Sequence, residues 1–238
     1  MSAVEQSPGF VLHGRRFREN SRILDVFTRD HGRQSLLARV SPKGGGVTWQ
    51  PFRELLFAWR GQRDLKTLRA AEPLAVFALD GEAGICGLYC NEVLQRLLPA
   101  QAALPGIYAI YRQTLEALAV AAPAAATLRR FEWHLLDALG YAPDTSEDWL
   151  TGAPLAEAGR YYFMPGHGFS VAMPGRDAVA IDAATMAALQ RGDFDDPALQ
   201  RALRRVTSAA LRPLLGEREL RSRQLMQQLL RIRGKQRP

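Results

Sequence analysis

Cysteine and histidine are the residues whose chemistry is easiest to recognise in a sequence, and here neither forms a catalytic or metal-binding pattern. Cys86 and Cys90 lie four residues apart on an expected helix, and two thiolates leave a structural zinc site two ligands short. The four histidines are scattered, without metal-ligand spacing: His13, His31, His134 and His167. We therefore expect buried thiols, no bound metal and no cofactor.

Acidic residues and serines give no catalytic signature either. Asp193, Asp195 and Asp196 stand beside an expected helix start, where the helix dipole favours negative charge. Ser170 lacks the Gly-x-Ser-x-Gly context of a hydrolase nucleophile, and the glycine-rich stretch at 41–46 does not have Walker spacing. We expect a protein that is not an enzyme, with a nuclease as the least favoured alternative.

Arginine and lysine dominate the two ends of the chain. Residues 1–73 hold thirteen basic against seven acidic residues, residues 74–215 eleven against fifteen, and residues 216–238 seven against two. This distribution favours a polyanion partner that is contacted at both ends of the chain. An ordinary solvated surface, with arginine favoured by genome composition, is an equally good interpretation of the charge alone.

Five short apolar runs must position the basic residues of the first part. They lie at 10–12, 23–27, 36–38, 52–59 and 65–70. Each has the length of a strand and is rich in β-branched and aromatic residues, with a tight turn at Gly32 and another near Gly61. Five strands within about seventy residues predict a small closed barrel.

Alternation along these strands separates a core face from a basic face. In the third strand it directs Leu36, Ala38 and Val40 towards the core. Basic groups on the other face would neutralise phosphates, and exposed rings such as Phe17 or Trp49 would stack on bases, with ordinary packing as the alternative for either ring. The candidate DNA-binding residues of the barrel are Arg15, Arg16, Arg18, Arg22, Arg33, Arg39, Lys43, Lys66 and Arg69.

Beyond Pro73 the apolar period changes from two to nearly four, which indicates helices. The apolar stripes predict helices over 85–97, 107–118 and 128–139, another starting at Asp196–Pro197, and a last one capped by Ser222. An irregular insertion is expected over about 142–180, with a short hairpin around Gly166 and Gly168. The predicted fold class is α+β, with a barrel over 1–78 and a mostly α-helical domain over 79–238.

The sequence shows no sign of a membrane or export segment. No apolar run approaches the roughly 20 residues of a membrane span, and the first residues lack the regions of a signal peptide. Two cysteines fit a reducing compartment. We expect a cytoplasmic protein without membrane contact.

Segments along nearly the whole chain follow one another in the order found in a known family. They are FVLHGRRFRENSRILDVFT, GRQSLLARV, QPFRELLFAW, LKTLRAAEP, GLYCNEVLQRLL, LRRFEWHLLDALGY and LRPLLGERELRSRQL. Together they resemble the RecO family of bacterial recombination mediators. The resemblance implies an N-terminal five-stranded OB-fold β-barrel followed by the helical domain.

The resemblance also implies a function in DNA repair at the bacterial nucleoid. Members of the family bind single- and double-stranded DNA and anneal complementary strands coated with single-stranded DNA-binding protein, without ATP. They bind the acidic C-terminal tail of that coat protein, and with RecR they help to load RecA at gaps. The alternative is a protein adaptor whose helical domain binds acidic tails and whose barrel contributes little DNA affinity.

The resemblance carries over to individual positions. Arg15, Arg33, Lys66 and Arg69 match basic positions of the family's barrel, and Arg221 and Arg223 match its terminal helix. The residues that match the tail-binding segment are Leu128, Arg129, Arg130, Phe131 and Leu135. A peptide carboxylate needs a guanidinium beside an apolar slot, which suits this segment and Arg129 in particular. The alternative is that Phe131 and Leu135 belong to the core and that Arg130 is solvated.

Two regions depart from the family pattern. The loop after the third strand, often longer and more basic in the family, keeps only Lys43 within a glycine run. Residues 142–180 contain no cysteine, whereas some relatives carry a four-cysteine zinc site there. We therefore expect DNA contact to depend on the strand arginines and no zinc to bind.

Overall fold

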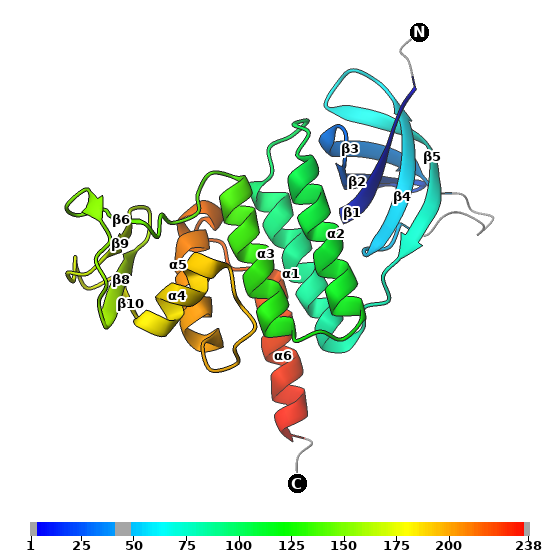
Figure 1. Ribbon diagram of the computed structural model, residues 1–238. Helices are drawn as coiled ribbons and strands as arrows, with labels where there is room; N and C mark the ends of the chain where they lie inside the picture. The colour runs from blue at the N-terminus through cyan, green and yellow to red at the C-terminus, as the bar shows by residue number, and fades with distance from the viewer. Residues whose placement is uncertain (1–3, 41–48, 236–238) are drawn as a thin grey trace. The chain divides into compact units, whose positions relative to one another are not determined.

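The computed structural model describes residues 4–40 and 49–235, which form two compact units (Figure 1). One unit comprises Met1–Ala121 together with Glu219–Pro238, and the other comprises Ala122–Arg218. The helical segments on either side of the second unit in sequence group with the barrel.

The first unit contains a closed five-stranded barrel. Its strands are β1 (Glu5–Arg18), β2 (Ser21–Thr28), β3 (Gly32–Arg39), β4 (Arg53–Arg60) and β5 (Leu65–Val76). They are ordered β1-β2-β3-β5-β4 around the barrel, with β3 and β5 parallel and the other pairs antiparallel. A five-stranded barrel of this kind is the OB-fold, so the predicted fold class and all five predicted strands are confirmed.

Apolar side chains at alternating strand positions fill the interior of the barrel. The buried cluster consists of Val11, Leu24, Val26, Leu36, Ala38, Leu55, Phe57 and Trp59. The predicted core positions Leu36 and Ala38 are confirmed, but Val40 is 39% exposed, so that part of the prediction is wrong. Val40 lies one residue past the end of β3, where alternation no longer determines the direction of a side chain.

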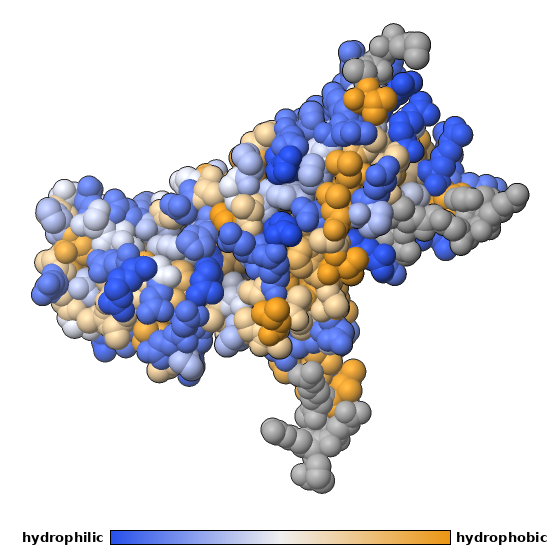
Figure 2. Space-filling model, turned by 45° about the vertical axis from the view of Figure 1, so that its right-hand side comes forward, coloured by the Kyte–Doolittle hydropathy of each residue, from blue (hydrophilic) through white to orange (hydrophobic). Residues whose placement is uncertain are grey.

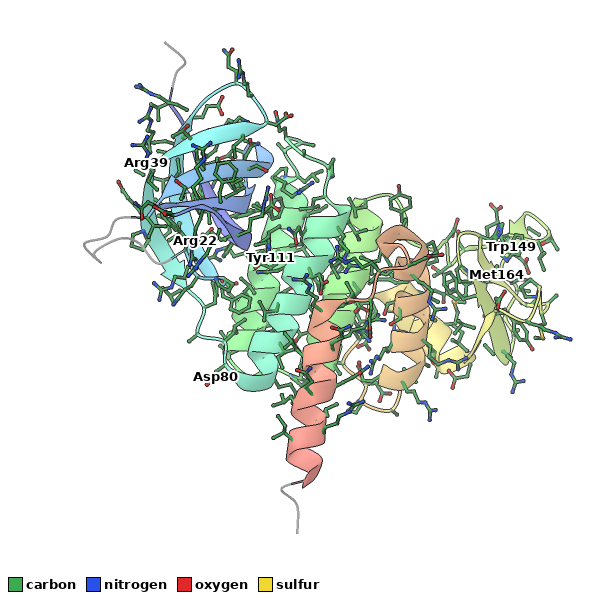
Figure 3. All side chains as sticks on the ribbon, turned by 180° about the vertical axis from the view of Figure 1, so that it is seen from behind. Arg22, Arg39, Asp80, Tyr111, Trp149 and Met164 are labelled. Atoms are coloured by element: carbon green, nitrogen blue, oxygen red, sulfur yellow. The ribbon has the colours of Figure 1, made fainter. Side chains whose placement is uncertain are left out.

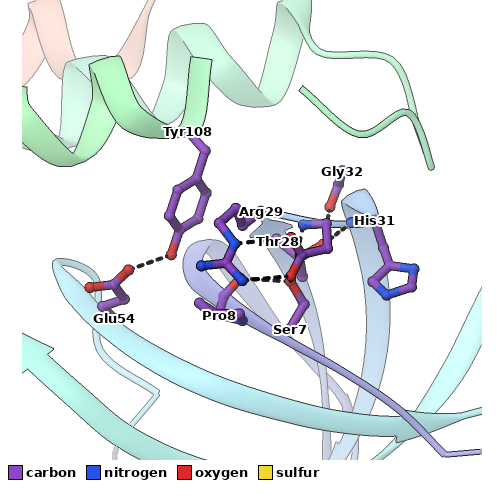
Figure 4. A network of polar contacts seen from close by, with 9 residues as sticks. Ser7, Pro8, Thr28, Arg29, His31, Gly32, Glu54 and Tyr108 are labelled. Atoms are coloured by element: carbon purple, nitrogen blue, oxygen red, sulfur yellow. Dashed lines mark hydrogen bonds and ion pairs between the residues drawn. The ribbon is translucent and has the colours of Figure 1, made fainter. Parts of the chain in front are cut away.

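Hydrogen bonds connect the turn between β2 and β3 to β1 (Figure 4). The Asp30 carboxylate accepts hydrogen bonds from Arg29 Nε and Ser7 Oγ, both at 2.9 Å, and the bond from Arg29 lowers the pKa of Asp30. Nearby, the Tyr108 hydroxyl donates to Glu54 Oε1 at 2.7 Å. Burial raises the pKa of Tyr108, and so does this bond, so the phenol stays a neutral donor.

Helices make up most of the remaining regular structure. They are α1 (Gly81–Leu97), α2 (Pro105–Ala119), α3 (Ala124–Ala138), α4 (Ala183–Arg191), α5 (Gln200–Leu215) and α6 (Arg221–Lys235). The helices predicted over 85–97, 107–118 and 128–139 are confirmed as α1, α2 and α3. The prediction of a helix start at Asp196–Pro197 is wrong by a few residues, because these residues form a turn before α5.

Helix α1 packs closely on the start of β4. An added Cβ at Gly87 would lie 2.6 Å from a ring carbon of Phe52, so the absence of a side chain permits this approach. Both cysteines, Cys86 and Cys90, are buried on this helix. Of the apolar stripe that predicts this helix, Tyr89 and Val93 are buried and Ile85 is half-buried, and the buried face also includes the two cysteines.

The second unit contains a small sheet where the sequence predicted an irregular insertion. Its strands are β6 (Glu147–Asp148), β7 (Ala153–Pro154), β8 (Arg160–Met164), β9 (Gly168–Ser170) and β10 (Val179–Asp182), in the order β10-β8-β9-β6-β7. The hairpin predicted around Gly166 and Gly168 is confirmed as β8 and β9, with Met164 paired to Gly168. The prediction of irregular structure is wrong, because β6, β7 and β9 span only two or three residues, too few for alternation to be recognised in the sequence.

Asp148 joins the strands of this sheet. Its carboxylate accepts hydrogen bonds from the backbone nitrogens of Leu150 and Val171 and from Ser170 Oγ, at 2.9–3.1 Å. Burial alone would raise the pKa of Asp148, but these bonds outweigh it and the pKa is lowered. The charged carboxylate therefore replaces backbone pairing that such short strands lack.

Candidate nucleic-acid interface

Exposed arginines gather at one end of the β1–β2 hairpin. In the strand register Arg16 lies directly opposite Arg22, and Ser21 pairs with Arg18 on one side and with Arg39 of β3 on the other. Figure 3 labels Arg22 and Arg39 on the barrel. The register therefore places arginines of three strands at one end of the hairpin, with Arg22 in the row of buried Ala38 and Arg39 in the neighbouring row.

This group continues from β3 to β5. The parallel ladder between these strands ends with Leu37 beside Thr67, and two residues further along each strand stand Arg39 and Arg69. Both arginines line the same cleft on the barrel surface. We call the exposed arginines of these strands the basic stripe: Arg15, Arg16, Arg18, Arg22, Arg39 and Arg69.

The cations of the basic stripe are not neutralised within the described part of the chain. All six side chains are exposed, and no ion pair is found for any of them among residues 4–40 and 49–235. Like charges directly opposite in a sheet, such as Arg16 and Arg22, destabilise it. Figure 2 shows strongly hydrophilic residues over much of the barrel surface. The stripe therefore leaves uncompensated positive charge on this surface of the barrel.

The two aromatic candidates differ in exposure. Phe17 is 42% exposed beside the basic stripe, and the guanidinium carbon of Arg18 lies 5.3 Å from the centre of its ring. Trp49 is partly buried and packs against the barrel core. The ring of Phe17 is thus open to solvent. Trp49 packs against the core and also lines the cleft.

Three other predicted DNA-binding residues lie outside the basic stripe. Lys66 is buried, and its ammonium group hydrogen-bonds to Gln34 Oε1. Arg33 is half-buried and donates from Nε to the carbonyl oxygen of Leu98 at 3.3 Å. Lys43 lies outside the described residues. The structure thus assigns internal partners to Lys66 and Arg33.

Sequence reasoning missed the uncharged residues of the cleft. Thr67, Leu68 and Ala71 line it together with Arg39 and Arg69. The cleft lies beside the parallel pairing of β3 and β5, two strands that are not consecutive in the chain. Nothing in the local pattern of either strand reveals that pairing.

Helix α6 carries Arg221 and Arg223, both exposed, and its start is held by a carboxylate from α1. Glu92 accepts hydrogen bonds from the backbone nitrogens of Arg221 and Ser222, at 3.0 and 3.1 Å, and from Ser222 Oγ at 2.9 Å. The expectation that Ser222 itself caps the helix is wrong, because Ser222 lies in the first turn and donates to Glu92. Burial raises the pKa of Glu92, but these bonds outweigh it and the pKa is lowered.

We expect the attachment of α6 to depend on the charge of Glu92. Because its pKa is lower in the folded protein, its stabilisation is complete above the unfolded value of about 4.3 and is lost as pH falls through the folded value. Glu92→Gln should weaken the attachment by about 1–2 kcal/mol at neutral pH, as loss of a helix cap does. Hydrogen exchange of α6 amides measures this loss.

Glu116→Gln is the matched control for that measurement. Glu116 is an exposed carboxylate on α2 that pairs with Arg112, so its loss should leave exchange in α6 unchanged. Equal protection of α6 in the wild type and Glu92→Gln would contradict the assignment of Glu92 as the cap.

The predicted peptide-binding residues on α3 are divided between core and surface. Phe131 and Leu135 are fully buried. Arg129 is also buried, and its Nη2 lies 2.6 Å from Glu132 Oε1. Arg130 is 41% exposed and contacts both carboxylate oxygens of Asp195, at 2.9 and 3.0 Å, while Leu128 is half-buried. Arg130, not Arg129, is the accessible guanidinium of this segment.

Among residues 4–40 and 49–235, no three histidine, cysteine or acidic side chains gather in a way that could hold a metal ion. In the same described ranges, no helix has the length and apolar character needed to cross a membrane.

Known proteins resemble this chain along nearly its whole length. Family models described as Recombination protein O N terminal and Recombination protein O C terminal match residues 1–77 and 78–224. DNA repair protein RecO of Actinobacillus pleuropneumoniae is 38% identical over 227 residues, which cover 93% of this chain and 94% of that protein. The proteins of the same name from Haemophilus influenzae and Pseudomonas putida are 35% and 37% identical, covering 94% and 92% of this chain and 96% and 95% of their own lengths.

Proposed function

This chain belongs to the RecO family of DNA repair proteins, and we propose that it binds single- and double-stranded DNA through the basic stripe. In this proposal it anneals complementary strands coated with single-stranded DNA-binding protein. With RecR it then helps to load RecA at gaps, in the bacterial cytoplasm at the nucleoid. We propose RecR and RecA as partners on the family resemblance alone, and we assign no binding residue to either.

The observation that carries the proposal is the group of exposed arginines without internal counter-ions. Arg16 and Arg22 oppose each other, and Arg18 and Arg39 share Ser21 as their register partner. An arrangement that costs stability in the free protein becomes favourable when phosphates neutralise it. Arg221 and Arg223 on α6 are two further exposed cations of the same unit.

The proposed role requires the protein to make or break no covalent bond. Annealing needs neutralised phosphates and two strands held close together, and arginines supply both without a nucleophile or a cofactor. We therefore propose a mediator rather than an enzyme.

We also propose that the tail of the coat protein binds at Arg130. A guanidinium that already contacts two carboxylate oxygens of Asp195 has the geometry to receive a peptide carboxylate in their place. Half-buried Leu128, two residues earlier on α3, offers an apolar surface nearby. Phe131 and Leu135 then support this segment from the core rather than touch the peptide.

The salt dependence of DNA binding tests the basic stripe. We expect the affinity for single strands to fall steeply with salt, and Arg22→Ala to reduce the slope of log affinity against log salt by about 0.7. Arg29→Ala is the matched control, since this exposed arginine is already paired with Asp30 and lies outside the stripe. Absent or salt-independent binding would contradict the proposal and favour the protein adaptor.

Annealing of precoated strands, without ATP or added metal, tests the remaining steps. We expect annealing on the intact coat protein, and less on a coat protein without its acidic tail. Arg130→Ala should reduce annealing only on the intact coat. An equal loss on both coats would contradict tail binding at Arg130.

A further inference from the structure

The barrel carries a cleft of about 500 Å³ beside the end of the β3–β5 ladder. Its lining consists of Arg39, Trp49, Thr67, Leu68, Arg69, Ala70 and Ala71. The ladder ends at Leu37 and Thr67, and β5 then continues to Val76 along β4. The cleft therefore lies where β5 leaves its parallel partner, at the β5 end of the basic stripe.

The lining combines two kinds of surface. Arg39 and Arg69 are exposed, and neither has an ion pair in the parts of the chain that the structure describes. Trp49, Leu68 and Ala71 are partly buried and pack against the barrel core, so the apolar wall is held in place from behind. A ligand of this cleft must present an anion and a flat apolar face together.

A nucleotide has both features. Guanidinium groups bind phosphate oxygens through paired hydrogen bonds, and aromatic or aliphatic side chains accept the face of a base. The volume lies within the range of about 300–1,000 Å³ that is typical of small-ligand sites. A base inside a duplex has both faces covered by its neighbours and must leave the stack to reach such a wall.

We propose that this cleft holds one unpaired nucleotide of a DNA strand, with its phosphate at Arg39 and Arg69 and its base against Trp49 and Leu68. The inference rests on the proposed DNA binding by the barrel and deepens it. The rest of the basic stripe contacts the backbone of either form of DNA, whereas this cleft accepts only an unpaired base. The cleft thus gives the barrel a preference for single strands.

Three probes at one salt concentration separate the base from the backbone. They are an oligodeoxythymidine strand, a strand of equal length made of abasic residues, and a duplex. Ala70→Trp fills the cleft from an exposed strand position and keeps both arginines. It should weaken binding of oligodeoxythymidine about 5- to 50-fold and leave the other two probes nearly unchanged.

Two further variants complete the set. Trp49→Ala should have the same selective effect, and Trp49→Phe should restore binding because it keeps an aromatic face. Arg15→Ala is the control, since this exposed arginine of the stripe lies outside the cleft and its loss should weaken all three probes alike. If Trp49→Ala does not fold, Ala70→Trp still decides the question.

The outcomes distinguish this inference from the proposed function. A wild-type protein that binds none of the probes refutes DNA binding by the barrel, and the cleft proposal falls with it. DNA binding in which Ala70→Trp weakens every probe equally, or none, refutes the nucleotide cleft and leaves the basic stripe standing. Displacement of oligodeoxythymidine by free deoxythymidine monophosphate at equal nucleotide concentration would also overturn it, because the cleft would then serve free nucleotides.

Discussion

Replacing Arg129 with alanine is expected to lower the free energy of unfolding of the second compact unit by about 3–5 kcal/mol. The Arg129 side chain is 7% exposed and pairs with Glu132, which is 1% exposed. Glu132 also accepts a hydrogen bond from Thr207 Oγ1, which links α3 to α5. Removal of the guanidinium leaves the Glu132 carboxylate buried without that cation, which is the costly half of a broken ion pair.

Urea unfolding followed by hydrogen exchange in α3 and α5 measures this loss. Arg130→Ala is the control on the same helix, since its exposed pair with Asp195 should contribute no more than about 1 kcal/mol. Arg129→Met combined with Glu132→Leu removes both charges and should lose much less stability than Arg129→Ala. Equal losses for Arg129→Ala and Arg130→Ala would contradict the account. If Arg129→Ala loses the stability expected here and also loses peptide binding, the lost binding is explained by local unfolding of α3.

Gly32→Ala is expected to destabilise the barrel-containing unit by about 2–4 kcal/mol. Gly32 has φ +65°, and an added Cβ would lie 1.9 Å from the carbonyl oxygen of Ala102 in the connection between α1 and α2. The substitution therefore combines a left-handed backbone with a clash against another backbone segment. The midpoint of urea unfolding, monitored by exchange in β2 and β3, reports the change.

Gly106→Ala is the matched control for Gly32→Ala. Gly106 lies in the first turn of α2, and an added Cβ would meet no atom within 4 Å. Alanine there should be neutral or stabilise the helix by up to about 1 kcal/mol. If both variants stayed within about 0.5 kcal/mol of the wild type, the proposed clash at Gly32 would be refuted.

The barrel was predictable because its signals are local. Alternation in the second and third strands, and a glycine at the turn between them, are properties of adjacent residues. The apolar stripes of α2 and α3 are local in the same sense. The sequence predicts only residues 10–12 of β1, because residues 5–9 contain no apolar run and residues 13–18 are exposed and carry no apolar alternation.

The site was only partly predictable, because a basic residue in a strand says nothing about what lies opposite it. Lys66 and Arg69 look alike in the sequence, yet Lys66 points to Gln34 inside the barrel and Arg69 lies in the cleft. Arg129 and Arg130 are neighbours on α3, and only their distant partners, Glu132 with Thr207 and Asp195, decide which one is accessible. Such partners are fixed by packing, which the local pattern does not encode.

The attachment of α6 to α1 has a consequence for how the chain is made. The second unit is inserted between two segments of the first, so α6 leaves the ribosome only after residues 122–218 have been synthesised. Until then Glu92 has no helix end to cap, and the surface of α1 that receives α6 stays open. A ribosome that stops before residue 221 would therefore release a chain whose inserted unit is complete but whose barrel-containing unit lacks its last helix. Such a product would leave Glu92 and its neighbours on α1 without the helix that they contact in the full chain, far along the sequence from where translation stopped.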